Sequence, residues 1–219
     1  MTTPQATIGH LALHYRPGDE DRARRLFELF GCTLVQNGPA PGTDGFSTIV
    51  VDDETWNYVD NVLYLSRVSD AQLDLETAIA DGLRAGAVDE DPRLSAYRAL
   101  RAEWPESLTH VGIRYSSFEA LERAVSAIEI ATAPGGELAG RASITKFKAR
   151  PGLDAEIDAA MAASPIFDDD DRPAFADYGV QCFVKTDLCA AGLLALGQTI
   201  ELDYFFAPAF EKVPSFGPA

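Results

Sequence analysis

The chain has 219 residues, with 18 Lys and Arg residues against 34 Asp and Glu residues, which gives a formal net charge of −16 at pH 7. This charge repels phosphate backbones and anionic lipid, so it argues against nucleic acid and membrane partners. A hydrophobic content of 47% is typical of a globular domain of this length. Three cysteines without a CxxC pair, and a beginning without a signal-peptide pattern, favour a reduced, cytoplasmic protein.

The first part of the chain, residues 1–69, predicts a β-α-β-β-β module. Residues 7–15 alternate between apolar and polar side chains, as a strand with one buried face does. Asp19 suits the start of the following helix through capping and the helix dipole, and Gly31 suits its end. The remaining strands of this module are expected at residues 32–36, 46–51 and 61–68.

An insertion follows over residues 70–107. Apolar residues spaced for two helices occur on either side of Asp91-Pro92, a pair that suits a helix start. This periodicity favours folded structure over a linker, and it predicts a segment that covers another part of the molecule.

The second part, residues 108–219, predicts another β-α-β-β-β module. Ser116 and Glu119 form a capping box before its helix. A second insertion, at about 150–173, contains a short helix and the acidic run 168–171, which we expect to be a solvated loop. The strands of this module are expected at residues 108–115, 138–149, 178–186 and 197–206.

The two modules begin with similar sequences. Residues 9–15 read Gly-His-Leu-Ala-Leu-His-Tyr, and residues 109–115 read Thr-His-Val-Gly-Ile-Arg-Tyr. Each segment has a histidine, an aliphatic residue, a small residue, a second aliphatic residue, a polar residue and a tyrosine. A repeat of about half the chain indicates that two similar units were joined within a single structural domain.

The repeat places His10 and His110 at equivalent points of their strands. Glu201 lies in the middle of the last strand, between two aliphatic residues, where a carboxylate costs free energy unless it finds a partner. If the modules curve into one open barrel, these three side chains converge. Two imidazoles and one carboxylate with open positions suit non-haem Fe²⁺, and Zn²⁺, Mn²⁺, Ni²⁺ or Co²⁺ are alternatives.

With these residues the chain resembles the vicinal oxygen chelate superfamily, which includes glyoxalase I, bleomycin-resistance proteins and type I extradiol dioxygenases. The resemblance is carried by residues 9–13, 109–113 and 197–202. It implies an α+β fold in which two βαβββ modules form an open barrel, with His10, His110 and Glu201 as metal ligands. Glyoxalase-like members have a fourth ligand on the last strand of the first module, but residues 61–65 contain no carboxylate or imidazole. The three-ligand set is therefore closer to the dioxygenase branch.

Other polar residues of the strands have open roles. His14 is a candidate acid or base near the metal, or a hydrogen-bonded pocket residue. Arg114 is expected to bind a substrate carboxylate or enolate oxygen, or to pair with Asp203. Asp203 is itself a rival ligand or an acceptor behind the ligands. Tyr15 and Tyr115 are expected in the core.

Three functions remain open at this point. The first is a metal-dependent enzyme that binds a small substrate through vicinal oxygens, with dioxygenase, lyase or isomerase chemistry and with the insertions as lids. The second is a metal-free small-molecule binding protein whose cavity is lined by Tyr64, Phe147 and Phe183. The third is a structural homodimer with a vestigial site.

Overall fold

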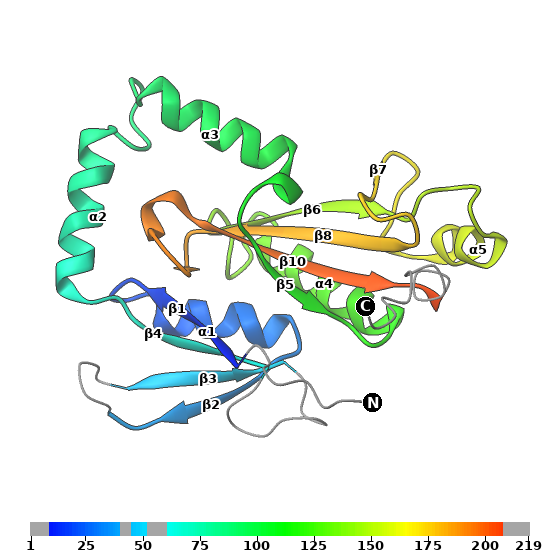
Figure 1. The fold of residues 1–219 in the computed structure, drawn as a ribbon, viewed down its shortest axis with the longest axis horizontal. Helices are drawn as coiled ribbons and strands as arrows, with labels where there is room; N and C mark the ends of the chain where they lie inside the picture. The colour runs from blue at the N-terminus through cyan, green and yellow to red at the C-terminus, as the bar shows by residue number, and fades with distance from the viewer. Residues whose placement is uncertain (1–8, 40–44, 52–60, 208–219) are drawn as a thin grey trace, which may run out of the picture.

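The computed structural model describes residues 9–39, 45–51 and 61–207, which fold into two five-stranded mixed sheets with helices on and between them (Figure 1). The first sheet has the order β2-β3-β4-β1-β9, with β1 at His10–Tyr15, β2 at Thr33–Asn37, β3 at Phe46–Val50, β4 at Val62–Arg67 and β9 at Cys189–Ala190. The second has the order β5-β10-β8-β6-β7, with β5 at Val111–Arg114, β6 at Ala142–Lys148, β7 at Arg172–Pro173, β8 at Gly179–Thr186 and β10 at Gln198–Phe205.

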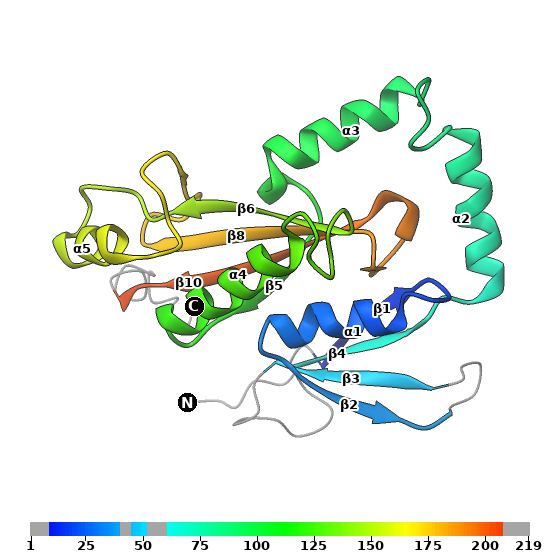
Figure 2. The same ribbon diagram turned by 180° about the vertical axis from the view of Figure 1, so that it is seen from behind.

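In these described ranges five α-helices accompany the sheets: α1 at Glu20–Leu29, α2 at Asp70–Gly82, α3 at Pro92–Glu103, α4 at Phe118–Thr132 and α5 at Ala155–Ala163. Helices α1 and α4 lie on the same side of the molecule, one against each sheet (Figure 2). Helices α2 and α3 form an arc that leads from the first sheet to the second. The α+β class expected from the sequence is confirmed, but the described strands form two separate sheets and no closed barrel.

The two sheets repeat one arrangement of strands. In each, the first strand of the module runs parallel to the last one, β1 beside β4 and β5 beside β10. The orders β2-β3-β4-β1 and β6-β8-β10-β5 therefore correspond strand by strand. The short strand β9, which belongs to the second half of the chain, pairs with β1 in the first sheet.

One hydrophobic core joins the two halves. It includes Leu13 and Phe27 from the first half together with Leu121, Cys182 and Leu202 from the second, and all five side chains are fully buried. Tyr15 is buried here as expected, and the Tyr115 hydroxyl donates a hydrogen bond to the Phe30 carbonyl oxygen. None of the helices in the described ranges combines the length and the apolar character needed to cross a membrane.

Two helix starts differ from expectation. The cap of α4 is Ser117 rather than Ser116, because the Ser117 Oγ accepts a hydrogen bond from the Ala120 N–H at 3.2 Å. Asp19 precedes α1 but makes no capping bond with its side chain. Its carboxylate instead accepts two hydrogen bonds from Arg141 at 2.9 and 2.8 Å, which ties α1 to the start of β6.

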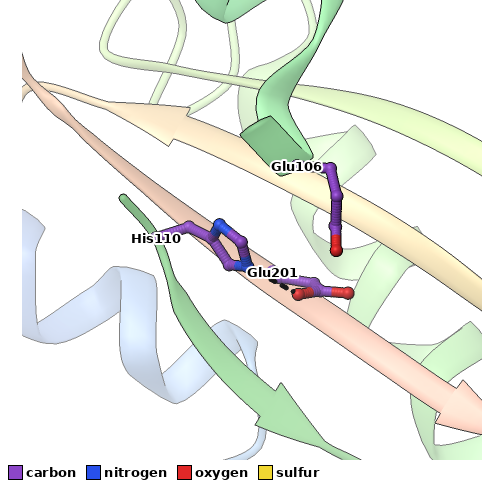
Figure 3. Close-up of side chains that lie close together, drawn as sticks. All are labelled: Glu106, His110 and Glu201. Carbon is purple, nitrogen blue, oxygen red and sulfur yellow. Dashed lines mark ion pairs between the residues drawn. The ribbon is translucent and has the colours of Figure 1, made fainter. Parts of the chain in front are cut away.

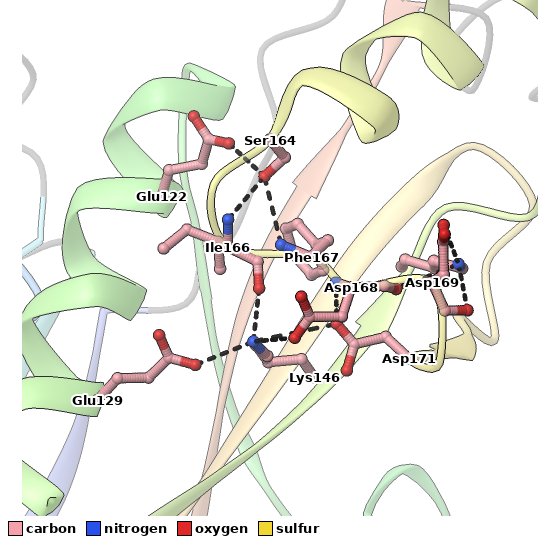
Figure 4. A network of polar contacts seen from close by, with 10 residues as sticks. Glu122, Glu129, Lys146, Ser164, Ile166, Phe167, Asp168, Asp169 and Asp171 are labelled. Carbon is pink, nitrogen blue, oxygen red and sulfur yellow. Dashed lines mark hydrogen bonds and ion pairs between the residues drawn. The ribbon is translucent and has the colours of Figure 1, made fainter.

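The acidic run 168–171 is only partly a solvated loop. Asp168 and Asp169 are exposed, but the segment lies against β6, where Lys146 and Lys148 contact its carbonyl and carboxylate oxygens (Figure 4). Lys146 also reaches Glu129 of α4 at 2.9 Å. The second insertion is thus fastened to the sheet by two lysines.

Candidate metal centre

Three ligand-type side chains converge on one face of the second sheet. Glu106, His110 and Glu201 place one ligand atom each within 4.8 Å of the others. Glu106 belongs to a 3₁₀ turn, Pro105–Ser107, and His110 directly precedes β5. Figure 3 shows the Glu106 side chain pointing toward the other two. The parallel pairing of β5 with β10, in which Gly112 faces Glu201, brings the histidine and the carboxylate together.

The contact between His110 and Glu201 requires a positive charge or a proton. The His110 Nδ1 lies 2.7 Å from the Leu108 carbonyl oxygen, which can only accept, so Nδ1 carries a proton and donates it. In the neutral ring Nε2 then has a lone pair, and it lies 3.0 Å from the Glu201 Oε2, which also has only lone pairs. The arrangement is satisfied by an imidazolium, by a protonated carboxyl or by a cation bound to both atoms.

Gln181 of β8 orients both carboxylates from behind. Its Nε2 donates hydrogen bonds to the Glu201 Oε1 at 2.7 Å and to the Glu106 Oε2 at 3.2 Å. Its Oε1 accepts from the Phe175 N–H at 2.8 Å. The amide is 3% exposed, so its orientation is set by these buried partners. A hydrogen-bonded layer of this kind is what fixes ligand carboxylates in metal sites.

The electrostatics of the group favour a cation. Burial is the main cause that raises the pKa of the Glu201 carboxyl, and the nearby charges of Glu106 and Asp203 raise it further. The hydrogen bond from Gln181 and the proximity of His110 oppose this shift. Glu201 is buried and Glu106 is half-buried, so the two carboxylates are only partly screened by water and repel each other, and a divalent ion bound between them would remove that repulsion.

An aromatic cluster closes one side of the centre. The Phe183 ring is 5.9 Å from the His110 ring, edge to face, and 5.5 Å from the Phe147 ring. The Phe175 ring packs against both phenylalanines. Of the three aromatics expected to line a cavity, Phe147 and Phe183 belong to this cluster, whereas Tyr64 lies on β4 of the other sheet.

His10 is not brought to the centre, contrary to the sequence prediction. Its ring lies 4.6 Å from the Tyr64 ring in the first sheet, at an interplanar angle of 34°, and within the described ranges it belongs to no group of three ligand-type residues. The register gives the reason. Tyr64 pairs with Ala12 as Glu201 pairs with Gly112, so the first module has a tyrosine where the second has the carboxylate.

His14, the candidate acid or base, and Arg114, the candidate substrate-binding residue, both contact neighbouring side chains. The His14 Nδ1 is 3.2 Å from the Ser66 Oγ. Arg114 donates two hydrogen bonds to Asp203, at 3.0 and 2.8 Å, and lies over the Phe205 ring. The expected pairing of Arg114 with Asp203 is therefore present, and it engages both carboxylate oxygens of the residue considered as a rival ligand.

Glu106 and Gln181 were missed by the sequence analysis. Glu106 stands four residues before His110, at the end of the segment taken as an insertion. Gln181 lies in an apolar strand, and a polar residue at such a position signals a buried hydrogen-bonding role. The role of Gln181 could therefore have been predicted from the sequence, whereas that of Glu106 depends on a turn that folds this residue back over β5.

No model of a protein family matches the chain, and no curated protein sequence matches it.

Proposed function

We propose that this protein is an enzyme of the vicinal oxygen chelate type that depends on a divalent metal held by Glu106, His110 and Glu201. The observation that carries the proposal is the 3.0 Å contact between the His110 Nε2 and the Glu201 Oε2, in a histidine whose other nitrogen donates to a backbone carbonyl. Metal-binding histidines have this second hydrogen bond because it directs the free lone pair at the ion. Two modules with matching strand order support the same family of folds.

The donor atoms of the site limit which metals and which reactions are expected. It has one imidazole and two carboxylates, whereas Fe²⁺ oxygenases use two imidazoles and one carboxylate. Oxygen-rich sets with one nitrogen suit Mn²⁺, Fe²⁺ or Zn²⁺. We therefore favour lyase or isomerase chemistry over the dioxygenase chemistry that the sequence suggested, with a substrate that offers two neighbouring oxygens.

The residues around the centre have distinct tasks in this proposal. A bound divalent ion would act as a Lewis acid and stabilise negative charge on the substrate oxygens. Gln181 keeps Glu106 and Glu201 turned toward each other through its two donated hydrogen bonds. Phe183 and Phe147 exclude water from one side, which strengthens every charge interaction at the centre.

Calorimetric titration with Mn²⁺ of protein that was purified without a His-tag and treated with a chelator tests the site. The wild type should bind one equivalent of Mn²⁺. Glu106→Gln and His110→Ala should each lower the affinity for Mn²⁺ by more than the tenfold to hundredfold that is typical of substituting a residue that only hydrogen-bonds to a ligand. His10→Ala removes an imidazole at the repeat-equivalent position and should bind as the wild type does. A folded wild type that binds none of Mn²⁺, Fe²⁺ and Zn²⁺ would refute the proposal and favour a metal-free binding protein.

A further inference from the structure

A positively charged cleft lies near the proposed centre in this strongly acidic chain. The cleft, of about 420 Å³, is lined by four cationic side chains and one acidic one, namely Arg98, Arg101, Arg141, Lys185 and Asp187. Its volume falls in the range of small-molecule sites. We infer that this cleft binds the oxyanionic group, phosphate or carboxylate, of a small molecule.

Among the described residues, two of the four cations, Lys185 and Arg101, have no carboxylate partner. Lys185 makes no ion pair within 4.0 Å in the part of the chain that the structure describes, and burial together with the charges of Arg101 and Arg172 lowers its pKa. Arg101 donates to the Leu196 carbonyl oxygen, a neutral group. The other two cations are neutralised, because Arg98 pairs with Glu90 and Arg141 with Asp19 and Asp187.

The backbone around Arg101 is shaped to hold it in the cleft. Gly197 has a φ of +72°, and a Cβ there would lie 2.8 Å from the Arg101 Nη2 and 2.8 Å from the Thr186 carbonyl oxygen. Only glycine leaves room for the guanidinium at this turn. Two residues further along β10, the Thr199 Oγ1 is buried and has no hydrogen-bond partner among the described residues. Thr199 pairs directly with Lys185, so both side chains share one face of the sheet.

The cleft and the proposed centre lie on this same face. Phe183 pairs with Glu201 and Lys185 with Thr199, so the lysine is two residues further along β8. Side chains at i and i+2 of a strand point to one side, roughly 7 Å apart. A small molecule whose oxyanionic group is held by Lys185 and Arg101 would therefore extend toward Glu201. That the anion belongs to the substrate rests on the proposed function, whereas anion binding itself does not.

Anion binding is tested on chelator-treated protein at low salt, by calorimetric titration with inorganic phosphate and, separately, with acetate. The wild type should bind at least one of them, and Lys185→Gln should weaken that binding at least about tenfold, as the loss of a charge-assisted hydrogen bond does. Arg123→Gln is the matched control, because Arg123 is exposed on α4 and the change in net charge is the same. Tighter phosphate binding would identify a phosphorylated ligand, and tighter acetate binding a carboxylated one.

Two results would overturn the inference. One is the absence of saturable heat from the wild type with either anion, and the other is an equal loss in Lys185→Gln and Arg123→Gln. Lys185→Arg keeps the charge and should retain binding, which separates charge from folding if Lys185→Gln is unstable. Mn²⁺ titration of Lys185→Gln should remain as in the wild type, so failure of the cleft and failure of the metal centre give different results.

Discussion

The substitution Glu201→Gln should stabilise the metal-free protein and destroy its response to metal. Glu201 is 6% exposed, and burial raises the pKa of its carboxyl, which means that the folded state penalises the charged form. A glutamine at this position retains the oxygen that accepts from Gln181 and offers an N–H₂ group to the His110 Nε2. The substitution therefore removes a buried charge without leaving either neighbour unpaired.

The size of the effect follows from these contacts. The hydrogen bond from the glutamine amide to His110 joins two neutral groups and requires no proton uptake by the carboxylate or the imidazole, so the expected gain is about 1 kcal/mol. For a domain of this length that corresponds to a rise in Tm of about 2–4 °C. With saturating metal the wild type should become more stable than the variant. An ion at a hundredfold excess over its Kd stabilises the wild type by about 2.7 kcal/mol and should leave the stability of the variant unchanged.

The pH dependence has a defined sign. A carboxyl with a raised folded-state pKa binds its proton more tightly in the folded protein, so the stability of the wild type falls as pH rises through that pKa. The advantage of Glu201→Gln should therefore grow from mildly acidic pH upward. Thermal unfolding with chelator and with Mn²⁺, at several pH values, measures each of these effects. A variant that is less stable than the wild type in chelator would show that the carboxylate is a structural partner of His110.

Two further substitutions test buried polar contacts. Asp19→Asn should cost about 2 kcal/mol at neutral pH, because it removes the carboxylate charge and one of the two oxygens that accept hydrogen bonds from Arg141. Since Arg141 lowers the pKa of Asp19, the difference, measured by urea unfolding, should vanish as pH falls through that folded-state pKa. Gln181→Leu should cost about 1–3 kcal/mol of stability, because it leaves the Phe175 N–H and the Glu201 carboxylate without their partner. It should also weaken Mn²⁺ binding roughly tenfold to hundredfold. Unchanged affinity in a folded variant would show that Gln181 does not orient the ligands.

Local pattern was enough to predict most elements of this fold. The alternation of residues 7–15 and the apolar periodicity before Gly31 indicated β1 and α1, and both are present within a few residues of the expected bounds. The two helices of the first insertion were also predicted, because helical spacing is visible within a dozen residues. The capping residue of α4 was wrong by one position, since Ser116 and Ser117 are both competent caps and only the backbone conformation selects between them.

The repeat correctly predicted two similar modules, but the expectation that its two histidines meet at one metal was wrong. It predicted that His10 and His110 are equivalent, and the matching strand orders agree with this. Equivalence under a duplication places two residues in similar surroundings, each in its own sheet, and it does not place them beside each other. The cross-strand neighbour decides what each histidine can do, and that neighbour is Tyr64 in one module and Glu201 in the other.

The sequence by itself determined the elements, their order and the presence of one histidine and one buried carboxylate of interest, because these depend on spacing along the chain. Tertiary structure alone decided which groups meet. Glu106 reaches Glu201 across 95 positions of sequence, and Lys185 joins Arg101 across 84, through strand register and a turn whose effects are not local. Side-chain proximity over such separations is set by how the sheets pair and pack, which no short pattern encodes.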